Sequence, residues 1–70
     1  MAYFIEQKIN NHLKRFELQN RGVKDKLNYA IDVITNLAKA YISNHYEIGD
    51  VSFSVIDTTN DITLYKIILG

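Results

Sequence analysis

The second half of the sequence contains the three residue types of a hydrolase triad, at Ser43, His45 and Asp50. A triad works because a scaffold holds the nucleophile, the base and the carboxylate within hydrogen-bond reach of one another. Three residues so close in sequence follow a single stretch of chain, which disfavours that arrangement. The better interpretation is that Ser43 ends a helix and that His45 interacts favourably with the helix dipole.

Other signatures of catalysis, cofactor binding and metal binding are missing from the sequence. The chain has no cysteine, and its three glycines are isolated rather than grouped in a phosphate-binding loop. His12 and His45 are the two histidines; His12 has no carboxylate one helical turn away, and two imidazoles alone do not make a specific metal site. Asp57 and Asp61 bracket a turn that lacks the glycine and the ligand spacing of a calcium loop. We therefore predict a protein that is not an enzyme and that has no cofactor or metal.

Basic residues gather around the turn that joins two predicted helices, at Arg21, Lys24 and Lys26. Residues 1–39 have a net charge of +3 and residues 40–70 a net charge of −3, although the chain as a whole is neutral. The cluster is a candidate site for an anion such as a phosphate. A solvated turn is the favoured interpretation, because nucleic-acid modules usually have stronger basicity or base-stacking aromatic residues.

Two helices are predicted in the first part of the chain. In residues 2–19, Ile5, Ile9, Leu13 and Phe16 are spaced by four, four and three residues, which is one face of a helix.

Residues 23–43 have a broader apolar arc, typical of a helix with more than one neighbour. We expect the two helices to pack antiparallel, with Leu27, Ile34 and Leu37 in the core between the first helix and a C-terminal hairpin.

That hairpin is predicted from the last twenty residues. Residues 51–55 alternate strictly between apolar and polar side chains, which indicates a half-buried strand. Residues 57–61 have turn-forming types, and residues 62–69 are rich in strand-forming types. The predicted fold is therefore a single α+β domain over residues 1–70, with element order α-α-β-β.

The second predicted strand has apolar residues on both faces. If Ile62, Leu64 and Ile68 face the helices, Tyr65, Ile67 and Leu69 lie on the opposite face. A two-stranded hairpin also has two unpaired edges. We therefore predict a homodimer or higher oligomer, in which a second chain completes or covers the sheet.

A further predicted contact lies on the first helix, where Phe4 and Leu18 fall away from the main apolar stripe. They are candidates for a surface that binds a partner protein. Frayed strand ends and helix ends that fold back are the alternative explanations for these exposed apolar residues.

The function predicted from these features is a small, non-enzymatic protein-interaction module, as a regulator or inhibitor, that acts as a homo-oligomer. The alternatives are an oligomeric binder of a small anionic or nucleotide-like ligand and a weak nucleic-acid binder. The sequence has no apolar run of membrane-spanning length and no signal peptide, so we expect a cytoplasmic protein without membrane contact. The many residues with AT-rich codons favour a low-GC bacterial or phage origin.

Overall fold

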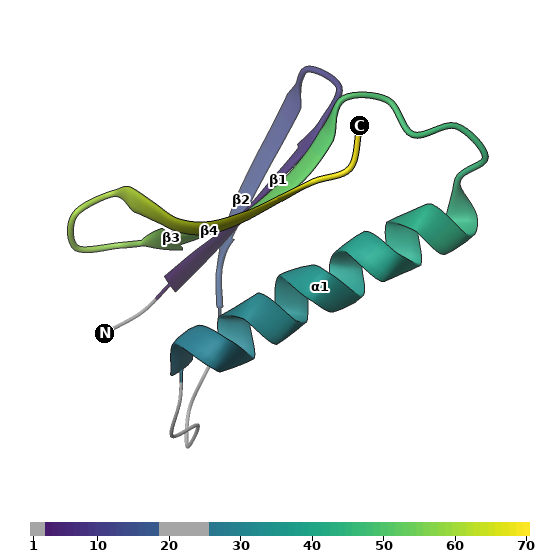
Figure 1. Ribbon diagram of the computed structural model, residues 1–70. Coiled ribbons are helices and arrows are strands. Elements are labelled where there is room, and N and C mark those ends of the chain that lie inside the picture. The colour runs from purple at the N-terminus through teal and green to yellow at the C-terminus, as the bar shows by residue number, and fades with distance from the viewer. Residues whose placement is uncertain (1–2, 19–25) are drawn as a thin grey trace.

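The computed structural model describes residues 3–18 and 26–70. They form one antiparallel sheet with the strand order β2-β1-β3-β4 and one helix that crosses a single face of it (Figure 1). The elements in chain order are β1 (Tyr3–Ile9), β2 (His12–Glu17), α1 (Lys26–Asn44), β3 (Val51–Asp57) and β4 (Ile62–Ile68).

The prediction of a first helix is wrong, and with it the predicted α-α-β-β order, because residues 3–17 form the β1–β2 hairpin. The error has a physical origin: residues four apart, such as Ile5 and Ile9, share a face in a strand as well as in a helix. The strands reverse direction at Asn10 and Asn11, between the paired residues Ile9 and His12. Asn10 has a φ of 54°, a left-handed conformation that asparagine tolerates better than most residues.

The helix predicted over residues 23–43 is confirmed from Lys26 onward, and its first three residues lie outside the described part of the chain. The predicted C-terminal hairpin is also confirmed, with β3 two residues longer than expected. The expected core is only partly right: Ile34 is fully buried, Leu37 is half-buried and Leu27 is exposed.

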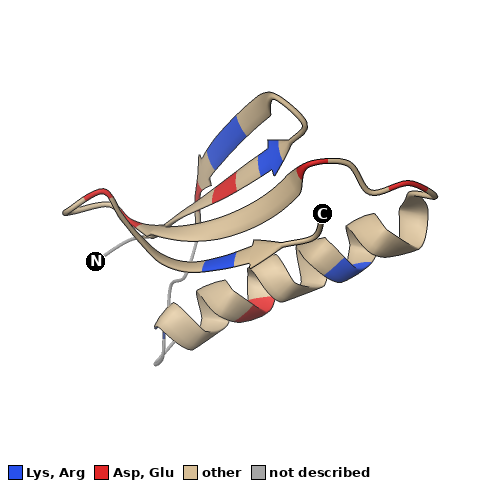
Figure 2. Ribbon diagram, turned by 45° about the horizontal axis from the view of Figure 1, so that its top comes forward, with Lys and Arg blue, Asp and Glu red and all other residues tan. Residues whose placement is uncertain are grey.

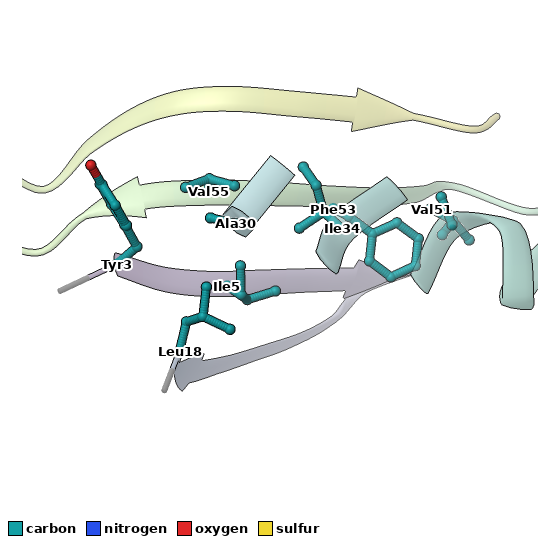
Figure 3. Packing of buried hydrophobic residues seen from close by; sticks show 9 residues of the cluster. Tyr3, Ile5, Leu18, Ala30, Ile34, Val51, Phe53 and Val55 are labelled. Carbon is teal, nitrogen blue, oxygen red and sulfur yellow. The ribbon is translucent and has the colours of Figure 1, made fainter. Parts of the chain in front are cut away.

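The hydrophobic core lies between α1 and one face of the sheet (Figure 3). Alternate residues of the two central strands point into it, because successive side chains of a strand face opposite sides. The helix contributes a row at four-residue spacing that includes two alanines, whose small side chains let α1 approach the sheet closely. The labelled members of this core are Tyr3, Ile5, Leu18, Ala30, Ile34, Val51, Phe53 and Val55.

Within the described residues no helix covers the opposite face of the sheet, which we call the outer face. Ser52 and Ser54 lie at its centre and are buried by the flanking strands. In the same part of the chain, no helix combines the length and the apolar character that crossing a membrane requires.

Candidate functional site

The two edges of the sheet differ strongly in composition. β2 forms one edge, and three of its six residues are charged: Lys14, Arg15 and Glu17. β4 forms the other edge and has Lys66 as its one charged residue (Figure 2). Charged side chains discourage pairing with a further strand, whereas an apolar edge favours it. β4 is therefore the candidate interaction site.

The backbone groups that β4 leaves unpaired follow from the hydrogen-bond alternation of antiparallel strands. The Leu69 N–H donates to the Val51 carbonyl oxygen at 2.9 Å, so Leu69, and with it Ile67 and Tyr65, direct their backbone groups toward β3. The N–H and C=O groups of Lys66 and Ile68 consequently point to the free edge.

A bulge divides β4 into two parts. Val55 is opposite Tyr65 and Ile56 is opposite Thr63, so Leu64 is the extra residue. Because an extra residue reverses the side-chain alternation, β4 continues regularly only from Tyr65 onward. The bulge also explains in part why β4 looks apolar on both faces when its residues are simply alternated: residues before and after Leu64 that alternation separates lie on one face.

The bulge and the pairing place the expected contact residues of β4 on the helix side of the sheet. Ile67 and Leu69 are half-buried and pack against the core, and Tyr65 is exposed at the edge of the same face. This reverses the expected orientation, in which Ile68 faced a helix. Ile68 instead lies on the outer face opposite Ser52 and is 66% exposed. Sequence reasoning missed it as a contact residue because the strand phase was assigned without the bulge.

The other two expected contact residues lie away from this edge. Leu18 follows β2 and is buried in the core cluster, where its N–H donates to the Tyr3 carbonyl oxygen at 2.9 Å. Phe4 belongs to β1, is half-buried and lies below the Arg15 guanidinium, whose carbon is 5.5 Å from the ring centre.

Arg15 connects three elements on the outer face. Its Nη2 donates to Glu6 Oε2 of β1 at 2.7 Å, and its Nη1 donates to Asp61 Oδ1 in the β3–β4 turn at 3.3 Å. The hydrogen bond with Glu6 is the largest cause that raises the pKa of Arg15, which is charged at any ordinary pH. Because the guanidinium of Arg15 is paired with both carboxylates, we assign this cluster a structural role that fixes the hairpin tip.

The residues considered for a triad do not come together. The His45 ring stacks on Tyr41 with the ring centres 3.7 Å apart, and its Nδ1 is 3.0 Å from the Tyr41 carbonyl oxygen. Asp50 is paired with Lys8 at 3.6 Å. The open hollow lined by residues 42–46 at the end of α1 includes Ser43 and His45 but not Asp50.

The remaining polar candidates are turn and surface residues. Asp57 Oδ1 accepts a hydrogen bond from the Thr59 N–H at 2.8 Å, as expected of an aspartate that begins a turn. His12 is exposed at the start of β2. Within residues 3–18 and 26–70 no three histidine, aspartate or glutamate side chains are grouped as metal ligands.

Of the basic cluster, Arg21 and Lys24 lie outside the described residues. Lys26 is the first residue of α1 and is half-buried. Comparison of the chain with protein-family models, with curated proteins and with solved structures gives no match.

Proposed function

We propose that this chain is a non-enzymatic protein-interaction module that works as a homo-oligomer through the edge of β4, and that it regulates or inhibits by binding rather than by chemistry. The observation that carries the proposal is the contrast between the two sheet edges. Both edge strands expose apolar side chains, Leu13 and Phe16 on β2 included, but half of the β2 residues are charged whereas β4 has Lys66 as its one charged residue.

The size and the charge of the chain support association. A domain of 70 residues has a small core, and oligomerisation is one of the usual ways to add stability at this size. The chain has no formal net charge, so two copies do not repel each other over long distances.

We do not extend the proposal to an anionic ligand or to nucleic acid. Lys26 is the one residue of the expected anion site that the structure describes, and no described feature pairs it with an anion-binding group. The charges of the β1–β2 hairpin are of both signs (Figure 2), which does not favour a phosphate backbone.

Light scattering coupled to gel filtration tests the proposal. At tens of micromolar, the unmodified protein should have twice the 8.1 kDa mass of one chain. Ile68→Lys should be a folded monomer, because it places a charge on an exposed side chain of the edge. Ile68 is a better position for this test than Ile67, which also packs against the core.

Ile42→Lys is the matched control, because Ile42 is 53% exposed on α1. This variant should keep the mass of the unmodified protein. A monomeric unmodified protein would overturn the proposal, as would an Ile68→Lys variant that still assembles.

A further inference from the structure

We infer that two copies of the chain pair their β4 strands antiparallel about a two-fold axis at Ile67, which joins their four-stranded sheets into one continuous sheet. The inference rests on the proposed function and adds to it the register of the contact. Its partner is a second copy of this chain.

Symmetry limits the possible registers. Residues directly opposite in an antiparallel pair point to the same face, and a two-fold axis perpendicular to the sheet preserves the faces. One residue of β4 must therefore be paired with the same residue of the second copy, and the two-fold axis passes midway between these two residues. The free regular part of β4 begins at Tyr65, so Tyr65, Lys66, Ile67 and Ile68 are the possible centres.

Three of these four centres are unfavourable. An axis at Lys66 places two lysines directly opposite each other, which is destabilising. An axis at Tyr65 extends the ladder into the bulge at Leu64, where the pairing is irregular. An axis at Ile68 needs Gly70, beyond the end of β4, for its next hydrogen-bonded pair.

An axis at Ile67 uses the free backbone groups of the strand completely. Lys66 of each copy is then opposite Ile68 of the other, and these are the residues whose N–H and C=O groups point to the free edge. Each such pair exchanges both of its hydrogen bonds. Both pairs lie within the regular part of β4.

The side chains also match in this register. On the helix side, Ile67 is opposite its own copy and Tyr65 is opposite Leu69, so both pairs are apolar or aromatic. On the outer face, the aliphatic part of Lys66 can cover Ile68 of the other copy while its ammonium group stays in water.

The helices do not obstruct the contact. α1 packs mainly on β3 and reaches β1 and β4 equally, so its axis lies over β3. Neighbouring strands are ~4.8 Å apart, which places β3 one and a half spacings from the two-fold axis and the two helices about 14 Å apart. Packed helices approach to about 8–10 Å, so the two helices fit side by side without a clash.

Single-cysteine variants test the register directly, because the chain has no cysteine of its own. Across the proposed axis the Ile67 Cα atoms form a non-hydrogen-bonded pair about 4.5 Å apart, a separation that a disulfide spans. Under mild oxidation, Ile67→Cys should give a covalent dimer on a non-reducing gel. An equal mixture of Lys66→Cys and Ile68→Cys should also cross-link, whereas each of these two variants alone should not.

Each alternative register gives a different result. Cross-linking of Lys66→Cys alone or Ile68→Cys alone would move the axis to that residue and overturn the inference, while the proposed function would stand. A dimer in which no β4 variant cross-links would overturn the inference, and the mass of the Ile68→Lys variant would then decide whether the β4 edge of the proposed function still stands. A monomer by light scattering would overturn both. If Ile67→Cys is unfolded by circular dichroism, the mixture of the two outer-face variants still decides the register.

Discussion

Truncating Ile34 to alanine tests the packing of α1 on the sheet. Ile34 has no exposed surface and belongs to the cluster that contains Ile5 and Phe53. The substitution removes three carbon atoms, which at ~0.8 kcal/mol per buried methylene is about 2.4 kcal/mol of burial. The cavity that remains adds to this, because surrounding side chains relax only in part, and measured losses for such substitutions are ~2–5 kcal/mol. We expect a loss of about 3–4 kcal/mol.

A loss of this size is large for the molecule. Stability of roughly 0.05–0.15 kcal/mol per residue gives ~3.5–10 kcal/mol for a domain of 70 residues. The free energy of unfolding should be measured by urea denaturation followed by far-UV circular dichroism. One fixed protein concentration is needed throughout, because the proposed association would make the apparent stability depend on concentration.

Ile42→Ala is the control, since it makes the same substitution in the same helix at a side chain that is 53% exposed. The change in intrinsic helix propensity is the same in both variants, so their difference reports burial. The control should lose about 1 kcal/mol or less. Equal losses in the two variants would refute the packing of α1 on the sheet described above.

Two further substitutions test the polar contacts at the ends of the sheet. Gly49→Ala should lower stability, because the new Cβ collides with the side-chain amide of Asn10, whose Oδ1 accepts the Asp50 N–H at 3.2 Å. The same change should cost less in an Asn10→Gly background, and equal costs in urea denaturation would contradict the collision. Arg15→Ala should speed amide hydrogen exchange in residues 58–61, since Arg15 ties Asp61 to β2. Unchanged exchange in that turn would show that the ion pair does not hold the hairpin tip.

The part of the fold that sequence periodicity predicts correctly is the part where helix and strand patterns differ. In residues 51–55 the alternation has a period of two, and no helix face fits it. The apolar arc over residues 23–43 repeats at alternating three- and four-residue steps, which no strand fits. Both predictions agree with the structure where it describes these residues.

Residues 2–19 lack such a distinction. The four-residue steps from Ile5 to Ile9 and from Ile9 to Leu13 are compatible with either structure when taken alone. The missed signal is Asn10-Asn11, two residues suited to a hairpin turn that interrupt the segment at its middle. Once a turn is placed there, Tyr3, Ile5 and Ile9 read as one face of a strand.

The candidate site was predicted in part, because residues 62–69 stood out as an apolar strand with no sufficient cover. The faces of that strand were not predictable, since they depend on its register with β3. The bulge at Leu64 puts Ile62 on the same side as Tyr65 and Ile67, although simple alternation separates them. A one-residue irregularity of this kind leaves no mark on composition or periodicity.

The difference between the two edges bears on the kind of assembly the chain can form. If β2 were as apolar as β4, the β2 edge of one copy could pair with the β4 edge of the next, and such head-to-tail contacts continue into open fibres. β2 opposes this with Lys14, Arg15 and Glu17, all exposed on a short strand. Pairing of β4 with the β4 of a second copy would instead be symmetric. It would cover the apolar edge of both chains and leave no β4 edge free for a third chain. In the proposed dimer the charged edge of the sheet would therefore matter as much as the apolar one, because it would limit association to two chains.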